Sequence, residues 1–210
     1  MIYEFGKRLL DIVGALVGII LFSPIMLAAC IFIKVVSPEG PILADTPKRI
    51  GLNKKPFKFL KFRSMIPNAQ NWLDSHPEYK EKYLANNFKL DPDPRLITGG
   101  KFMRKSSIDE LPQFFNVLIG DMSIVGPRAY YPFEIDQQLQ KSPEVSDLID
   151  IVLSVKPGIT GAWQIGGRSK VGFSGRVSMD AEYAKRRSIL YDLIVILKTP
   201  YVVITGKGAY

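Results

Sequence analysis

Hydrophobic residues of this chain are concentrated in one long run near the N-terminus, and shorter apolar and polar stretches alternate after it. Residues 12–33 carry no charge. As a helix they would be about 33 Å long, which is enough to cross a bilayer. Three later stretches have helical patterns: residues 68–87 with a break at Pro77, 133–153, and 177–187. The pattern predicts a mostly α-helical fold with a few short β-strands.

Three further segments complete this reading. Residues 57–65 roughly alternate aromatic with basic side chains, which indicates a short strand or an interfacial segment. Residues 156–161 read as a tight turn. Residues 188–205 are apolar apart from two charges and a proline. They fit either a core helix or an amphipathic helix on a bilayer surface.

Ser23 and Pro24 interrupt the long apolar run near its centre. Proline removes a helical hydrogen bond and bends the chain, and a serine hydroxyl can bond a freed carbonyl. Basic residues flank both ends of the run, and the positive-inside rule places such residues in the cytoplasm. Two arrangements remain open on these residues: a kinked helix that spans the bilayer, and a re-entrant helix whose ends emerge on the same side.

Composition narrows the function classes. The chain has 28 Lys and Arg against 20 Asp and Glu, a net charge of +8, so we expect an anionic partner. Cys30 is the single cysteine and His76 the single histidine. A disulfide framework, a thiolate metal cluster and a multi-histidine zinc site are therefore excluded. A histidine-based triad would have to use His76, which lies in a polar helical stretch, and is not expected.

Two adjacent carboxylates, Asp109 and Glu110, lie between Arg104 and Arg128. The four residues from Ser107 to Glu110 also fit a capping box, a purely structural role. Side chains of neighbouring residues project about 100° apart on a helix, so the two acids would take separate tasks. One would face a reacting phosphorus and the other would bind a hard cation. Magnesium suits such a site because it prefers few carboxylates, several waters and substrate phosphates.

Several basic residues near turns are candidates for phosphate contacts. Arginine and lysine recognise phosphate, but for any one such residue taken alone a solvated surface charge is the more common role. The sequence has neither the P-loop ending nor a Rossmann glycine pattern after a strand. The candidates are Lys61, Arg63, Arg95, Arg104, Arg128 and Arg168.

The chain resembles the bacterial sugar transferases of the monotopic polyprenyl-phosphate phosphoglycosyl transferase family. The resemblance covers nearly the whole chain through motifs that occur in order. They are KRLLD (7–11), Ser23-Pro24, FLKFRSM (59–65), SIDELPQ (107–113), NVLIGDMS (116–123), GPR (126–128), KPGITG (156–161) and QIGGR (164–168).

The resemblance implies a fold in two parts. Residues 1–36 would form an anchor, a re-entrant membrane helix broken at the Ser-Pro pair. Residues 37–210 would form a single α/β-type catalytic domain with interfacial amphipathic helices. The family's location would place the protein at the cytosolic face of the bacterial inner membrane, with both termini in the cytoplasm.

The resemblance also implies an activity. A sugar 1-phosphate would pass from a UDP-sugar to undecaprenyl phosphate with release of UMP and with Mg²⁺ as cofactor, the first membrane step of O-antigen, capsule or exopolysaccharide assembly. Asp109 would be the nucleophile that forms a phosphosugar-aspartate intermediate, and Glu110 would hold the metal. Arg104, Arg128, Arg168 and Lys61 would contact phosphates and uridine, with Arg63 and Arg95 as further substrate-binding candidates.

One position departs from the family pattern, because Ala129 stands where a second proline usually follows Pro-Arg. The segment 68–96 and the Gly-Ala-Tyr ending are more similar to the branch that transfers hexose 1-phosphates, glucose or galactose.

Membrane lipids and a second copy of the chain are further expected partners. Nucleic acid is not, because no recognition motif accompanies the charge. A non-enzymatic membrane-surface scaffold that binds anionic lipid remains the alternative.

Overall fold

The computed structural model describes residues 2–86, 90–167 and 171–205. These residues are mostly helical with a few very short strands, as the sequence predicts. The helices are α1 (Ile2–Val36), α2 (Ala69–Asp74), α3 (Pro77–Ala85), α4 (Gly100–Lys105), α5 (Gln113–Ile119), α6 (Pro132–Lys141), α7 (Ser146–Leu153), α8 (Ala162–Gly166), α9 (Phe173–Arg186) and α10 (Ile189–Thr205). Single 3₁₀ turns occur at η1 (Leu52–Lys54), η2 (Ile108–Glu110) and η3 (Pro143–Val145).

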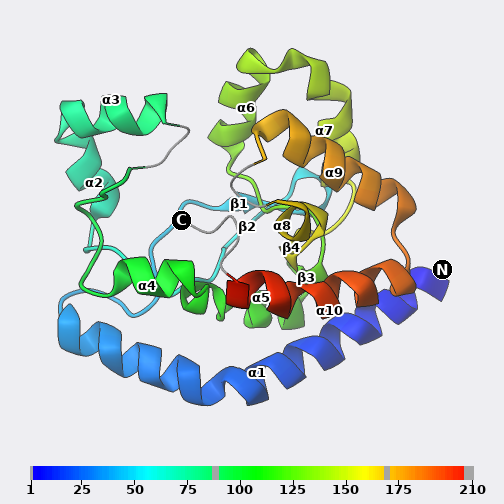
Figure 1. The fold of residues 1–210 in the computed structure, drawn as a ribbon, viewed down its shortest axis with the longest axis horizontal. Helices are drawn as coiled ribbons and strands as arrows, with labels where there is room; N and C mark the ends of the chain where they lie inside the picture. Colours follow the sequence, from blue (N-terminus) through cyan, green and yellow to red (C-terminus); the bar gives the residue numbers. More distant parts are fainter. Residues whose placement is uncertain (1, 87–89, 168–170, 206–210) are drawn as a thin grey trace.

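The helices form a base with two lobes above it (Figure 1). Helix α1 runs along the bottom of the molecule, with α4, α5 and α10 lying on it. Helices α2 and α3 form one lobe, and α6, α7 and α9 form the other. Two small sheets lie between the α6, α7 and α9 lobe and the base (Figure 1). In one, β1 (Arg49–Ile50) pairs antiparallel with β2 (Pro56–Phe57), and in the other β3 (Ser123–Val125) pairs parallel with β4 (Gly158–Thr160).

Helix α1 continues through Ser23 and Pro24 rather than ending there. The Ser23 hydroxyl donates a hydrogen bond to the carbonyl of Ile20 at 2.9 Å, as expected next to a helix proline. Figure 1 shows that the helix bends near its middle, so that both ends rise toward the same side. The described residues contain one helix long and apolar enough to cross a membrane, Tyr3–Val36, and most of its apolar window is exposed.

Buried charges hold the N-terminal half of α1 to the rest of the protein. The Lys7 ammonium lies 3.0 Å from a carboxylate oxygen of Asp192 on α10 and 3.5 Å from Asp11. Asp11 accepts hydrogen bonds from the Ser123 hydroxyl at 2.8 Å and the Ile124 amide at 2.9 Å. Because buried charges are costly unless paired, these contacts fix where α1 meets β3 and α10.

The C-terminal half of α1 packs on the same body. Ile33 is fully buried in a cluster with Phe62, Ile97 and Met103. Lys34 donates a hydrogen bond to the Gly40 carbonyl at 2.9 Å. The two ends of α1 therefore contact one folded unit.

Two predictions about the chain path need correction. Residues 156–161 are not a tight turn, because Gly158–Thr160 forms β4 and pairs with Ser123–Val125. A β-carbon on Gly126 would overlap the Lys156 carbonyl, so glycine is what allows the two backbones to lie this close. Residues 133–153 form two helices, α6 and α7, because the chain leaves helical geometry at Ser142.

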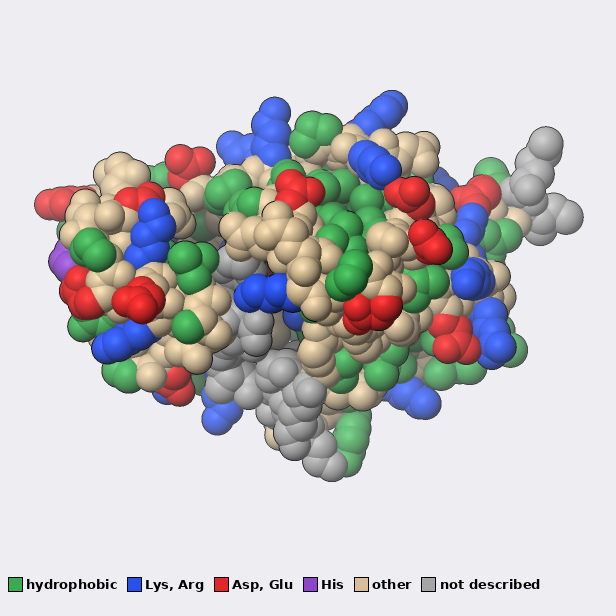
Figure 2. Space-filling model, turned by 90° about the horizontal axis from the view of Figure 1, so that it is seen from above, with side chains coloured by type: hydrophobic (Ala, Val, Ile, Leu, Met, Phe, Trp, Pro, Cys, Tyr) green, Lys and Arg blue, Asp and Glu red, His purple; other side chains and the backbone are tan. Residues whose placement is uncertain are grey.

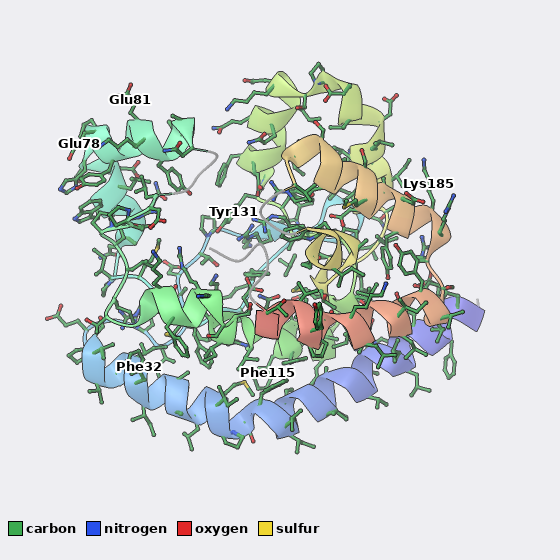
Figure 3. All side chains as sticks on the ribbon, viewed as in Figure 1. Phe32, Glu78, Glu81, Phe115, Tyr131 and Lys185 are labelled. Carbon is green, nitrogen blue, oxygen red and sulfur yellow. The ribbon has the colours of Figure 1, made fainter. Side chains whose placement is uncertain are left out.

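A broad apolar surface covers the base of the molecule. Phe32 on α1 and Phe115 on α5 belong to it (Figure 3). The opposite face, seen in Figure 2, carries charged side chains of both signs. The exposed apolar residues of α1, α5 and α10 are Phe5, Leu9, Val13, Leu16, Val17, Ile20, Leu21, Ile25, Leu27, Ile31, Phe32, Val35, Phe115, Ile119, Leu190, Leu193, Ile194, Leu197 and Tyr201.

Candidate active site

A cavity of about 1260 Å³ lies between the two lobes, above the roughly 300–1,000 Å³ of typical small-molecule sites. Tyr131 lies near the centre of the molecule, between the lobes (Figure 3). The lining includes both acids of the central motif and five of the six predicted basic residues: Asp109, Glu110, Lys61, Arg63, Arg95, Arg104 and Arg128. Arg168 lies outside the described residues. The fold thus brings motifs that are far apart in the sequence to one cavity.

The central acids lie on a 3₁₀ turn rather than at a capped helix start. Ser107 has a left-handed backbone (φ 58°) and makes no side-chain cap. The predicted capping box is therefore wrong: the Glu110 amide bonds the Ser107 carbonyl at 3.1 Å and closes the turn η2 instead. Pro112 directly precedes α5, as its preference for helix starts suggests.

Asp109 is a buried carboxylate beside a lysine. Its side chain is 2 % exposed, and Oδ2 lies 2.7 Å from the Lys61 ammonium. The contact is a close ion pair. Burial raises the pKa of Asp109 above its ordinary value, while the Lys61 charge opposes the rise and Glu110 adds to it. A desolvated carboxylate of this kind is more basic and therefore more nucleophilic.

Asn116 on α5 holds the strand-like segment that carries Lys61. Its amide oxygen accepts a hydrogen bond from the Leu60 amide at 2.9 Å, and its amide nitrogen donates to the Lys58 carbonyl at 2.8 Å. The Phe62 amide then bonds the Asp109 carbonyl at 2.8 Å. These bonds satisfy backbone groups in the way a neighbouring strand would, and they set the Lys61–Asp109 pair.

Glu110 points elsewhere than Asp109, as the expected angular separation requires. Its side chain is 42 % exposed to the cavity, and one carboxylate oxygen lies 4.0 Å from the Lys61 ammonium. The described residues contain no group of three or more metal-binding side chains. One accessible carboxylate in a cavity large enough for a phosphorylated substrate nevertheless fits magnesium, which takes few protein ligands.

The predicted basic residues differ in what their side chains do. Arg104 lines the cavity and donates to the Ser64 hydroxyl at 3.0 Å. Arg63 is buried and donates to the carbonyls of Pro41 at 2.6 Å and Ser37 at 2.7 Å. Its guanidinium therefore braces two chain segments rather than pointing free into the cavity.

Arg95 is held in a similar way by a carboxylate. It is buried and forms two hydrogen bonds to Asp93, at 2.9 and 2.8 Å. Its guanidinium also lies over the ring of Tyr83, 5.1 Å from the centroid. Asp93 already compensates this positive charge, which leaves Arg95 less suited than Arg104 to bind an added anion.

The turn that carries Arg128 is held from both sides. The Arg128 amide donates to Asp180 on α9 at 3.0 Å. On the other side, the Arg49 guanidinium lies 3.3 Å from the ring centroid of Tyr131 and donates to the Ala129 carbonyl at 2.9 Å. A stacked arginine thus fixes this turn where a second proline is absent.

A family model of bacterial sugar transferases matches residues 2–206. The chain belongs to the bacterial sugar transferase family. This agrees with the resemblance drawn from the motifs, and it places the buried Asp109 and its cavity in a family of transferases.

Relatives of this bacterial sugar transferase have substrate-specific names. The undecaprenyl-phosphate galactose phosphotransferase of Salmonella typhimurium is 39 % identical over 99 % of this chain and 42 % of its own length. The exopolysaccharide production protein ExoY of Rhizobium meliloti is 36 % identical over 98 % of this chain and 88 % of its own. The UDP-glucose:undecaprenyl-phosphate glucose-1-phosphate transferase of Escherichia coli is 35 % identical over 97 % of this chain and 41 % of its own length. The chain therefore spans about two fifths of the length of several curated relatives it matches.

Sequence reasoning missed four cavity residues of this sugar transferase. Arg49 and Arg176 line the cavity, as do Gln113 and Trp163. Gln113 ends the SIDELPQ motif that the resemblance rests on, and Trp163 directly precedes the QIGGR motif, so a signal for both was present. Arg49 and Arg176 sit in no such motif, and only the folded chain brings them to the cavity.

Proposed function

We propose that this protein transfers a sugar 1-phosphate from a UDP-sugar to undecaprenyl phosphate and releases UMP. The observation that carries the proposal is a buried carboxylate, Asp109, held 2.7 Å from Lys61 in a large cavity lined by arginines. Family membership and the names of relatives such as the galactose phosphotransferase support the substrate classes. The product would start the assembly of a surface glycan, which is in line with the relative named for exopolysaccharide production.

The chemistry would run in two displacements. A carboxylate oxygen of Asp109 attacks the phosphorus attached to the sugar, and the bond from that phosphorus to the bridging oxygen breaks. UMP leaves with the bond's electron pair, and the sugar phosphate stays on Asp109. A phosphate oxygen of undecaprenyl phosphate then attacks the same phosphorus, the bond to Asp109 breaks, and the carboxylate is regenerated.

The cavity residues have separate parts in these steps. Lys61 orients the carboxylate of Asp109 and lies where negative charge develops on the attacked phosphate. Arg104 and Arg128 would hold the diphosphate. Glu110 would hold magnesium, which when bound neutralises charge on the donor's phosphates and on the leaving group.

A panel of UDP-sugars tests the function. Full-length protein in native membranes is mixed with undecaprenyl phosphate, Mg²⁺ and one UDP-sugar at a time, and UMP is measured. We expect release with UDP-galactose or UDP-glucose, the hexose branch, faster than with N-acetylated sugars. A non-enzymatic scaffold that binds anionic lipid would release no UMP with any donor, and that result would refute the proposal.

We further propose that α1 is re-entrant, with both ends on the cytosolic face of the bacterial inner membrane. Both ends of α1 pack on one folded unit, through Lys7 at one end and Ile33 at the other. A helix with ends on opposite faces of a bilayer core about 30 Å thick could not make both contacts. The exposed apolar residues of α1, α5 and α10 suit contact with the same membrane surface.

Cysteine labelling tests this topology. In a Cys30→Ser background, single cysteines at Glu4 and Glu39 are exposed to a membrane-impermeant maleimide in intact cells and in inside-out vesicles. We expect both sites to react only in the vesicles, because both ends of α1 would face the cytosol. Labelling of the two sites from opposite sides would establish a spanning helix instead.

A further inference from the structure

Arg128, Trp163 and Arg176 meet in the part of the cavity bordered by α8 and α9. The guanidinium carbon of Arg128 lies 5.4 Å from the ring centroid of Trp163, and that of Arg176 lies 5.5 Å from it. All three side chains line the cavity. They come from three separate elements: the turn after β3, helix α8 and helix α9.

The basic residues of this group differ from those whose charges act on Asp109. The basic residues whose charges act on Asp109 are Lys61 and Arg104. The positive charge that acts on Arg176 is that of Arg128. The cavity therefore has basic residues at two places: Lys61 and Arg104 beside Asp109, and Arg176 beside Arg128, which the proposed function also assigns to the donor diphosphate.

The cluster of Arg128, Trp163 and Arg176 has more positive than negative charge. Burial lowers the pKa of Arg176, and the neighbouring charge of Arg128 lowers it further. Two carboxylates face these guanidiniums. Glu134 Oε1 lies 3.7 Å from Arg128 Nε, and Asp180 accepts a hydrogen bond from the Arg128 backbone amide. Burial raises the pKa of Asp180 to about 7, so this carboxylate is only partly charged at neutral pH.

The cluster also contains two hydrogen-bond donors and one acceptor, Asp180 Oδ1, that have no partner among the described residues. Arg176 Nε and Trp163 Nε1 have no hydrogen-bond partner among the residues that the structure describes. Indole and guanidinium nitrogens are donors without acceptor capacity. A buried donor left unsatisfied is costly, so a ligand rich in acceptors and negative charge would be stabilised here.

We propose that Arg176 and Trp163, together with Arg128, form a second anion subsite that binds a phosphate monoester. Such a group carries about −1.5 to −2 charges and three acceptor oxygens at neutral pH, which matches both the excess charge and the unsatisfied donors. The inference rests on the proposed function, in which two species end in a phosphate monoester: the leaving UMP and the lipid acceptor. Both have the same chemistry, so the experiment separates them.

Binding is measured by calorimetry on full-length protein in lipid nanodiscs, without turnover. The probes are UMP, farnesyl phosphate as a short isoprenyl monophosphate, and uridine, which has no phosphate. We expect Arg176→Gln to lower the affinity for UMP or for farnesyl phosphate by about tenfold or more and to leave the affinity for uridine unchanged. Trp163→Phe, which keeps a ring but loses the donor, should weaken the same probe. The probe that is affected identifies the source.

Two further variants protect the interpretation. Arg186→Gln is the matched control, because Arg186 lies on the same helix with a side chain that is 76 % exposed and paired with Glu182. It should change no affinity. Arg176→Lys should bind the phosphate more tightly than Arg176→Gln does, because lysine retains the positive charge. The subsite would be refuted if Arg176→Gln bound UMP and farnesyl phosphate each as tightly as wild type does. A loss of affinity confined to uridine would also refute it.

The outcome is separable from the proposed function. Failure of every UDP-sugar to release UMP would refute the transferase reaction, whereas phosphate binding that depends on Arg176 would still stand. Conversely, normal UMP release together with phosphate affinities that do not change when Arg176 is replaced would refute the subsite alone.

Discussion

Replacing Asp109 by asparagine should abolish UMP release, lowering the rate by about 10³-fold or more. Asparagine has nearly the same shape, but its amide cannot attack phosphorus as a carboxylate does. The fold should survive, because the side chain is almost fully buried and asparagine does not carry the desolvation penalty of a buried charge. UMP release is measured together with the intact mass of the protein after incubation with a UDP-sugar and no acceptor.

The mass measurement gives the covalent mechanism its own readout. Wild-type protein should gain the mass of one sugar phosphate, and Asp109→Asn should gain nothing. Asp150→Asn is the matched control, because Asp150 on α7 is 72 % exposed, pairs with Lys54 and lies outside the cavity lining. If Asp109→Asn retained full turnover or still acquired the sugar phosphate, another residue would be the nucleophile.

Replacing Glu110 by glutamine should raise the Mg²⁺ concentration needed for half-maximal UMP release by at least about tenfold. A neutral amide binds a hard cation far less well than a carboxylate does. The substitution should not disturb folding, since the Glu110 side chain is 42 % exposed and lies 4.0 Å from Lys61. Mg²⁺ titrations of UMP release after treatment with EDTA give the measurement.

Glu81→Gln controls for the loss of one negative charge. Glu81 lies on the outside of α3, away from the cavity (Figure 3). It should leave the Mg²⁺ requirement unchanged. An unaltered Mg²⁺ requirement in Glu110→Gln would remove this residue from the metal site, and wild-type activity that is insensitive to EDTA would remove the metal from the mechanism.

The different orientations of the two acids were predictable from local geometry. Adjacent side chains on a helical turn point in different directions, and in the structure Asp109 is buried while Glu110 is accessible. The backbone conformation of residues 107–110 was not predictable from the sequence. Ser107 adopts a left-handed backbone, and the residues enter a 3₁₀ turn because the Asp109 carbonyl is tied to Phe62 on a distant segment.

The basic residues show the limit of sequence patterns more clearly. Arg63 and Arg104 look alike as candidates, yet Arg63 is committed to carbonyls 22 and 26 residues away. Arg49 reaches the carbonyl of Ala129 across 80 residues. No local pattern carries that information, because such a contact depends on how separate elements pack.

The sequence by itself determined the long apolar segment with Ser23 and Pro24, the mostly helical elements, and the motifs that assign the family. These follow from the local spacing of apolar residues, prolines and charges, which physical chemistry links directly to helices and turns. The tertiary structure alone decided which arginines face the cavity, and it decided that both ends of α1 contact one body. The reason is that buried polar groups must be satisfied by whatever lies beside them, as when Asp11 accepts the hydroxyl of Ser123, 112 residues further along the chain.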